Sequence, residues 1–79
     1  MNREGLRERL AVEGIRPSAY ALDGQEHAET YVLGIVPGGW AVWYSELGRR
    51  VHEERFDTED DACAELLLRL EGDPTTRIR

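Results

Sequence analysis

The chain of 79 residues contains a single cysteine, no lysine and no long apolar run. One cysteine, Cys63, excludes an internal disulfide framework and favours a reducing compartment. A membrane-spanning helix needs about 20 consecutive apolar residues, and no segment approaches that length. The first residues are charged rather than apolar, so we expect no secretory leader. These absences predict a cytoplasmic protein that does not bind a membrane.

Basic residues are also in the minority, with 10 against 16 acidic residues and a net charge of -6. Binding to a phosphate backbone requires a concentrated basic surface, so direct contact with nucleic acid is disfavoured. An acidic chain is better suited to a basic protein partner, for instance one whose own ligand is polyanionic or nucleotide-like. The charge can equally serve solubility alone, and both interpretations stay open.

Hydrophobic periodicity predicts helices at both ends of the chain, with Leu6 and Leu10 on the first and Leu66, Leu67 and Leu70 on the second. Between them, two apolar segments flank a Pro-Gly-Gly reversal and predict a β-hairpin. A short strand at residues 18–22 and a charged edge strand at residues 49–56 complete the pattern. Short connections favour antiparallel pairing. The sequence therefore predicts an α+β, two-layer domain over residues 1–74, with an N-terminal helix, a three- or four-stranded antiparallel meander, a C-terminal helix and a disordered tail at 75–79.

Residues capable of catalysis lack the spacing that catalysis requires. His27 and His52 have carboxylates nearby but no recognised metal-ligand spacing. Cys63 falls on the apolar stripe of the last helix, where a buried thiol is inert. We therefore expect no enzyme, no cofactor and no metal. An acid–base or metal-binding role for the histidines is the weaker alternative.

The stretch from Tyr31 to Tyr44 holds both tryptophans and two of the three tyrosines. Strand alternation places Trp40 and Tyr44 on one face of the hairpin and Trp43 on the other. A domain this small has enough helix to cover one face well, so we expect an aromatic residue of the other face to be exposed. Should the first helix cover that second face, no ring would be exposed. The partner-binding residues that we predict are the aromatic anchors and acidic rim Trp43, Tyr44, Glu46, Glu53 and Glu54.

The run from Gly39 to Leu70 resembles small bacterial immunity proteins of polymorphic toxin systems. The recurring elements are an aromatic strand ending in Tyr44-Ser45-Glu46, a turn at Gly48, an acidic residue before Phe56, and Thr58-Glu59-Asp60 opening a helix. These motifs are structural, and they carry no functional residue onto this chain. The resemblance implies a protein that neutralises a toxin by binding to it inside the producing cell.

Two hypotheses of different kinds follow. The first is a non-enzymatic immunity protein that occludes the active site of a secreted toxin with a basic cleft, its acidic residues steering the encounter. The second is a homo-oligomeric structural or adaptor domain, such as a homodimer, that uses an exposed sheet face or edge.

Overall fold

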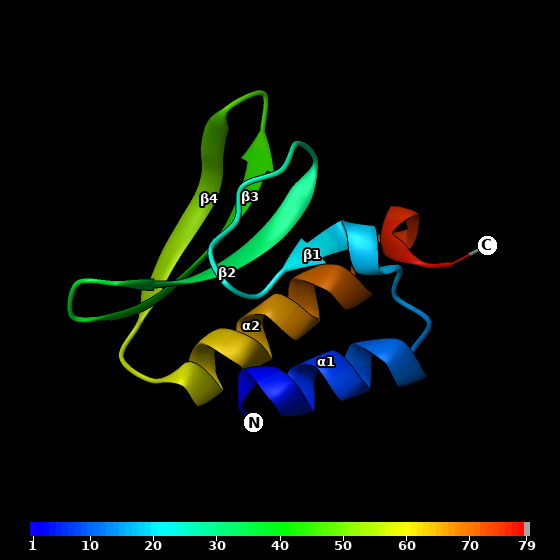
Figure 1. The fold of residues 1–79 in the computed structure, drawn as a ribbon, viewed down its shortest axis with the longest axis horizontal. Coiled ribbons are helices and arrows are strands. Elements are labelled where there is room, and N and C mark those ends of the chain that lie inside the picture. The colour runs from blue at the N-terminus through cyan, green and yellow to red at the C-terminus, as the bar shows by residue number, and fades with distance from the viewer. Residues whose placement is uncertain (79) are drawn as a thin grey trace.

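The structure, a computed structural model, describes residues 1–78 and contains two helices, one near each end of the chain, and a four-stranded sheet (Figure 1). The elements are α1 (Arg3–Val12), β1 (Tyr20–Ala21), β2 (Thr30–Val36), β3 (Gly39–Glu46), β4 (Arg49–Phe56) and α2 (Glu59–Glu71), with short 3₁₀ turns at Pro17–Ala19 and Pro74–Thr76. The predicted α+β, two-layer fold is confirmed.

The strands lie in the order β1-β2-β3-β4. The β2–β3 and β3–β4 pairs are antiparallel hairpins, as predicted. The β1–β2 pair is parallel, with Tyr20 opposite Tyr31, so the expectation of a wholly antiparallel meander is wrong at this edge. Because β1 is only two residues long, the loop at residues 22–29 suffices to return the chain before β2 begins. The predicted strand at residues 18–22 is correspondingly shorter.

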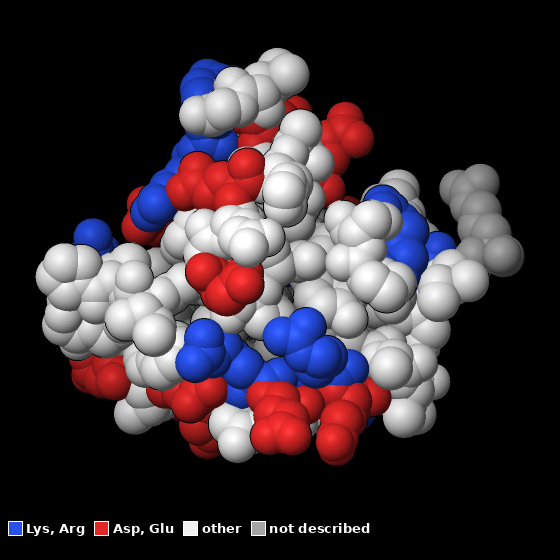
Figure 2. Space-filling view, in the orientation of Figure 1, with Lys and Arg blue, Asp and Glu red and all other residues white. Residues whose placement is uncertain are grey.

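Both helices cover the same face of the sheet, which we call the inner face (Figure 1). α2 packs directly on β2 and β3, and α1 lies beside α2. The core between them contains fully buried residues from both helices and two strands: Leu6, Leu10, Leu33, Val42, Ala62, Cys63, Leu66 and Leu70. Because Leu6 and Leu10 of α1 belong to this same core, the possibility that the first helix covers the second face is wrong. Figure 2 shows acidic and basic side chains adjacent to one another along the exposed side of α1.

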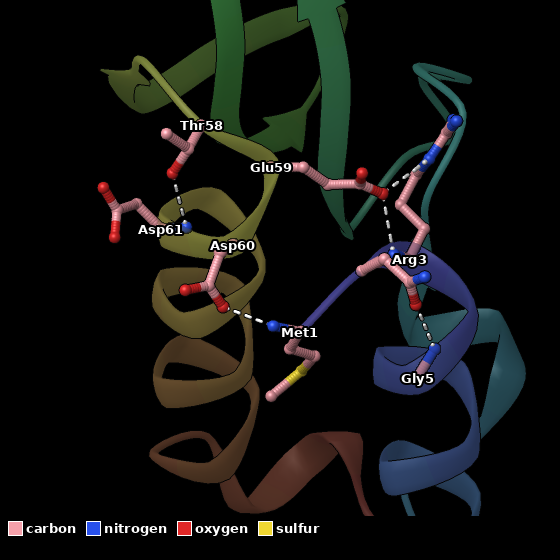
Figure 3. Close-up of polar contacts among 8 residues, drawn as sticks. Met1, Arg3, Gly5, Thr58, Glu59, Asp60 and Asp61 are labelled. Carbon is pink, nitrogen blue, oxygen red and sulfur yellow. Dashed lines mark hydrogen bonds and ion pairs between the residues drawn. The ribbon is translucent and has the colours of Figure 1, made fainter.

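The two helices begin side by side, and each start has a side-chain cap (Figure 3). Asn2 Oδ1 accepts a hydrogen bond from Gly5 N at 2.8 Å, and Thr58 Oγ1 accepts one from Asp61 N at 3.1 Å. Such caps satisfy backbone donors that have no partner within the helix. The Glu59 carboxylate joins the helices by accepting a hydrogen bond from Arg3 N at 2.8 Å.

The C-terminal segment is ordered where we expected a disordered tail. Thr76 is 2% exposed, and its hydroxyl donates to Leu70 O at 2.9 Å, a carbonyl at the open end of α2. Thr76 O accepts from Arg16 N at 2.8 Å, and Ile78 N donates to Gly14 O at 2.7 Å. The prediction fails because this polar segment pairs with the backbone that follows α1. Residue 79, the last of the predicted tail, lies outside the described residues.

A β-bulge interrupts β4 at His52 and Glu53. Tyr44 lies opposite Val51, whereas Val42 lies opposite Glu54, so β4 has one extra residue. His52 takes a φ of +57°, unusual for a residue other than glycine.

The bulge is held from α2, because Arg69 Nη1 donates to His52 O at 2.8 Å. Its consequence is a change of face. Counted from the inward-facing Phe56, regular alternation would place Arg50 inward and Val51 outward, whereas the bulge leaves Arg50 outward and Val51 inward.

Candidate functional site

Trp43, the predicted anchor, is not on the surface. It is 2% exposed on the outer face, where no helix lies. The loop at residues 22–29 covers it: a Cβ added at Gly34 would lie 2.9 Å from Trp43 Cη2 and 3.4 Å from Gly24 Cα. Arg50 covers the rest of the ring, with its guanidinium carbon 3.9 Å from the ring centroid. The expectation of an exposed indole on the second face is therefore wrong. We expected that only a helix could cover a sheet face, whereas here a loop and an arginine cover the Trp43 ring.

Two of the predicted rim residues are already neutralised within the chain. Glu53 lies 3.6 Å from Arg50 Nη1, and Glu54 lies 3.3 Å from Arg69 Nη2. The structure also divides the predicted set between two faces. Trp43 belongs to the outer face, whereas Tyr44, Glu46 and Glu54 share the inner face. The five residues do not form one surface.

A hollow lies on the inner face where β2, β3 and β4 pass the C-terminal turns of α2. Its volume is about 480 Å³, and it is lined by Tyr31, Tyr44, His52, Leu68, Arg69, Gly72 and Asp73. We call it the tyrosine hollow. Leu68 is 64% exposed at its edge. A second hollow of about 280 Å³, which includes Glu29 and Arg16, shares Tyr31, Tyr44 and Asp73 with the first.

A pair of tyrosines separates the two hollows. The ring centroids of Tyr31 and Tyr44 are 4.8 Å apart and the rings are inclined by 59°. Tyr31 Oη donates a hydrogen bond to Asp73 Oδ2 at 2.9 Å. Burial, together with this hydrogen bond to a carboxylate, raises the pKa of Tyr31 to about 12. The hydroxyl and the amide of Thr75 donate to Asp73 Oδ1 and lower the pKa of Asp73, so this carboxylate is held as an anion.

The surroundings of Tyr44 are acidic. Burial raises the pKa of Tyr44, and the charges of Glu29, Glu46 and Asp73 raise it further. Across residues 1–78 none of these three carboxylates has an arginine nitrogen within 4.0 Å. The hollow thus combines exposed aromatic and aliphatic carbon with negative charge that the fold does not neutralise.

The β3–β4 turn, which begins after Glu46 at the end of the strand that carries Tyr44, has an exposed leucine. Leu47 is 83% exposed and has a φ of +50°, and Gly48 follows with a φ of +76°. Positive φ at both central residues is the pattern of a type I′ turn, in which asparagine and glycine are preferred. At the top of Figure 2, uncharged atoms lie beside those of a basic side chain. Leu47 thus exposes its side chain and holds a backbone conformation that asparagine or glycine would adopt at lower cost.

Of the predicted partner-binding residues, Tyr44 lines the tyrosine hollow, and Glu46 lies on the same face of β3 without lining it. Tyr31, Glu29 and Asp73 were not among the predicted residues. The pairing of Tyr31 with Tyr44 follows from a two-residue turn between β2 and β3, a register that the sequence left open. Asp73 lies just after the last helix, and nothing in its local sequence indicates a contact with the sheet.

Other candidate chemistry finds little support in the geometry. Within the described residues, no group of three or more His, Cys, Asp and Glu side chains is placed to hold a metal ion. Cys63 is fully buried, and burial raises the pKa of its thiol to about 11, which disfavours the nucleophilic thiolate. Over residues 1–78, neither helix is both long and apolar enough to cross a membrane.

Comparison with known proteins gives no assignment: no family model, curated protein or solved structure matches this chain.

Proposed function

We propose that this chain is a non-enzymatic protein-binding module that docks on a basic partner through the tyrosine hollow and the adjoining β3–β4 turn. One observation carries the proposal: Glu29, Glu46 and Asp73, which make no ion pair with any residue of 1–78, lie close to a tyrosine pair that lines an open hollow. Other acidic residues of the neighbouring strand and helix, such as Glu53, Glu54 and Glu65, are already matched with arginines. Uncompensated charge at one place favours an external cation.

The specific role that we propose is that of a cytoplasmic immunity protein, which inhibits a cognate secreted toxin by occluding its active site. The resemblance of residues 39–70 to such proteins supports this role. A toxin with a basic substrate cleft would be attracted by Glu29, Glu46 and Asp73. Burial of Tyr44 and Leu47 in the complex would then slow dissociation, because desolvated aromatic and apolar side chains supply most of the lasting affinity.

The alternative of a homo-oligomer that uses an exposed sheet face has lost its main premise. At the centre of the outer face Val32, Ala41 and Trp43 are at most 2% exposed. The free edge of β4 is interrupted by the bulge at His52, a feature that discourages pairing between strand edges. Concentration-dependent mass measured by light scattering tests this alternative, and a strict monomer rejects it.

The proposal predicts that a secreted toxin is encoded beside this gene, and that protein is used to test it. Binding and inhibition are measured for the native chain, for Tyr44→Ala and for Leu47→Ser. We expect each substitution to weaken binding at least tenfold, chiefly by faster dissociation, consistent with the loss of about 1.4 kcal/mol or more.

The matched control is Glu53→Gln, since Glu53 is engaged with Arg50 away from the hollow. It should leave affinity within about twofold, a difference of roughly 0.4 kcal/mol. If the neighbouring gene product does not bind, or if Tyr44→Ala and Leu47→Ser bind it as well as the native chain does, the proposed function is wrong.

A further inference from the structure

We propose that the tyrosine hollow receives an arginine side chain of the partner. This inference rests on the proposed function, because it names the chemical group that the docking surface recognises. The hollow offers the three elements that a guanidinium requires: an aromatic face, an oriented carboxylate and apolar surface for the aliphatic stem.

The carboxylate of Asp73 is oriented before any ligand arrives. Thr75 supplies both of its donors to Oδ1, at 2.7 Å and 3.0 Å. Oδ2 accepts a single hydrogen bond, from Tyr31 Oη at 2.9 Å. A carboxylate oxygen has two acceptor sites, so Oδ2 retains capacity for a donor from outside the chain. Holding the carboxylate in place reduces the entropy lost when such a donor binds.

The rings supply the surface on which a planar cation can stack. Tyr31 and Tyr44 both line the hollow with Asp73, and Leu68 adds aliphatic carbon at 64% exposure. A guanidinium is planar and weakly hydrated, so it stacks on aromatic rings and binds carboxylates through paired donors. Lysine, a compact and strongly hydrated ammonium, makes poorer use of this geometry.

The basic groups already at the hollow leave its negative charge largely in place. Arg69 lines it, but its guanidinium is held by Glu65 at 2.8 Å, by Glu54 at 3.3 Å and by the carbonyl of His52. Arg16 lies in the second hollow, where its Nε and Nη1 donate to the neutral oxygens Thr75 O and Ser18 Oγ, so its positive charge offsets part of the negative charge there. Because Glu29, Glu46 and Asp73 outnumber this arginine, net negative charge remains for an incoming cation.

The inference is tested by NMR titration of the ¹⁵N-labelled chain with N-acetyl-arginine methylamide. The matched probe is the citrulline compound, which keeps the shape of the side chain and lacks its charge. We expect saturable millimolar binding of the arginine probe, with amide shifts centred on Tyr44, Gly72 and Asp73. The lysine probe should bind more weakly and the citrulline probe should produce no saturable shift. Equal shifts with arginine and citrulline, or arginine shifts centred elsewhere, would overturn the inference.

A pair of variants separates a specific site from general acidity. The affinity for the arginine probe should fall at least threefold in the double variant Glu29→Gln/Glu46→Gln. It should not fall in Glu4→Gln/Glu8→Gln, which makes the same change in net charge at exposed positions of α1. Both doubles alter exposed or half-exposed side chains without ion pairs, so folding should be retained. Equal weakening in the two doubles would exclude a defined arginine site.

The two proposals fail in distinguishable ways. If the arginine probe binds and the neighbouring gene product does not, the proposed function is wrong and the proposal of an arginine site still stands. If that product binds through Tyr44 and the arginine probe causes no response, the arginine site is wrong and the proposed docking surface still stands.

Discussion

The guanidinium carbon of Arg50 lies 3.9 Å from the centroid of the Trp43 ring, and Arg50 Nη2 lies 2.6 Å from Glu26 Oε1 in the loop above the outer face. One arginine thus covers an indole and fastens the loop that covers the remainder. The bulge at His52 lets Arg50 face outward, opposite Ser45, while Glu54 and Phe56 further along the same strand face inward. The second face of the sheet is consequently closed without a third layer of secondary structure.

Replacement of Arg50 should open this cover. We expect Arg50→Gln to lower the free energy of unfolding by about 1 kcal/mol, since the cation–π contact and a partly exposed ion pair are lost together. Tryptophan emission should shift to longer wavelength as Trp43 becomes hydrated. The control is Arg49→Gln, a neighbouring exposed arginine on the inner face. Identical emission and stability in the two variants would show that Arg50 is not the cover.

The close packing of Trp43 and Gly24 against Gly34 provides a second test of how the outer face is covered. A Cβ at Gly34 would meet Trp43 Cη2 at 2.9 Å with Gly24 Cα behind it, so Gly34→Ala should cost about 1–3 kcal/mol by overpacking. Gly5→Ala is the control. A Cβ at this position would have its nearest neighbour at 3.4 Å, and the residue lies in a helix, where alanine is favoured over glycine. Urea unfolding measures both. Equal free energies of unfolding for Gly34→Ala and the native chain would contradict the tight packing.

The β3–β4 turn should show opposite effects on stability and binding. We expect Leu47→Asn to raise the free energy of unfolding by about 0.5–1 kcal/mol, because asparagine tolerates the left-handed conformation that leucine resists. The same change should weaken binding of the partner. Leu68→Asn removes another exposed leucine from a helix, so it should bring no such gain in stability. A loss of stability in Leu47→Asn would show that the leucine serves the fold.

The tyrosine pair predicts how stability depends on alkaline pH. The folded chain raises the pKa of Tyr31 from 10.0 to about 12, so the neutral phenol is the form that the fold stabilises. This contribution is fully present below pH 10 and is lost as pH rises towards about 12. Urea unfolding across that interval should show a smaller decline for Tyr31→Phe than for the native chain. Tyr44, whose pKa is also raised, accounts for part of the decline that remains in Tyr31→Phe. Equal declines in the variant and the native chain would show that Tyr31 does not cause the loss of stability.

Local signals in the sequence were enough to predict the helices and the central hairpin. They were not enough to predict what covers the outer face of the sheet. Asn2 and Thr58 cap the two helices, and the apolar alternation of Tyr31 to Tyr44 specifies the central hairpin, because these depend on neighbours within a few residues. The bulge and the closed outer face depend on contacts between distant residues. Arg69 with His52 and Arg50 with Glu26 are the pairs that create them, and no local pattern announces either.

The same distinction explains the site. Glu46 and Tyr44 share the inner face through simple alternation, which the sequence shows. Asp73 reaches Tyr31 only after α2 has packed on the sheet, 42 positions along the chain. Trp43 was misplaced because aromatic content was taken as exposure, whereas a buried ring covered by a loop gives the same sequence pattern.

The extra residue in β4 also constrains how this chain can diverge. Losing His52 alone would restore a regular ladder and leave Arg50 opposite Ser45 and Val51 opposite Tyr44, on the faces that they occupy now. Keeping every residue in a regular ladder would instead turn one half of the strand over, so that either Arg50 would leave the indole or Phe56 would leave the core. In descendants of this chain, a one-residue gap at His52 should therefore be compatible with retention of both Trp43 and Arg50.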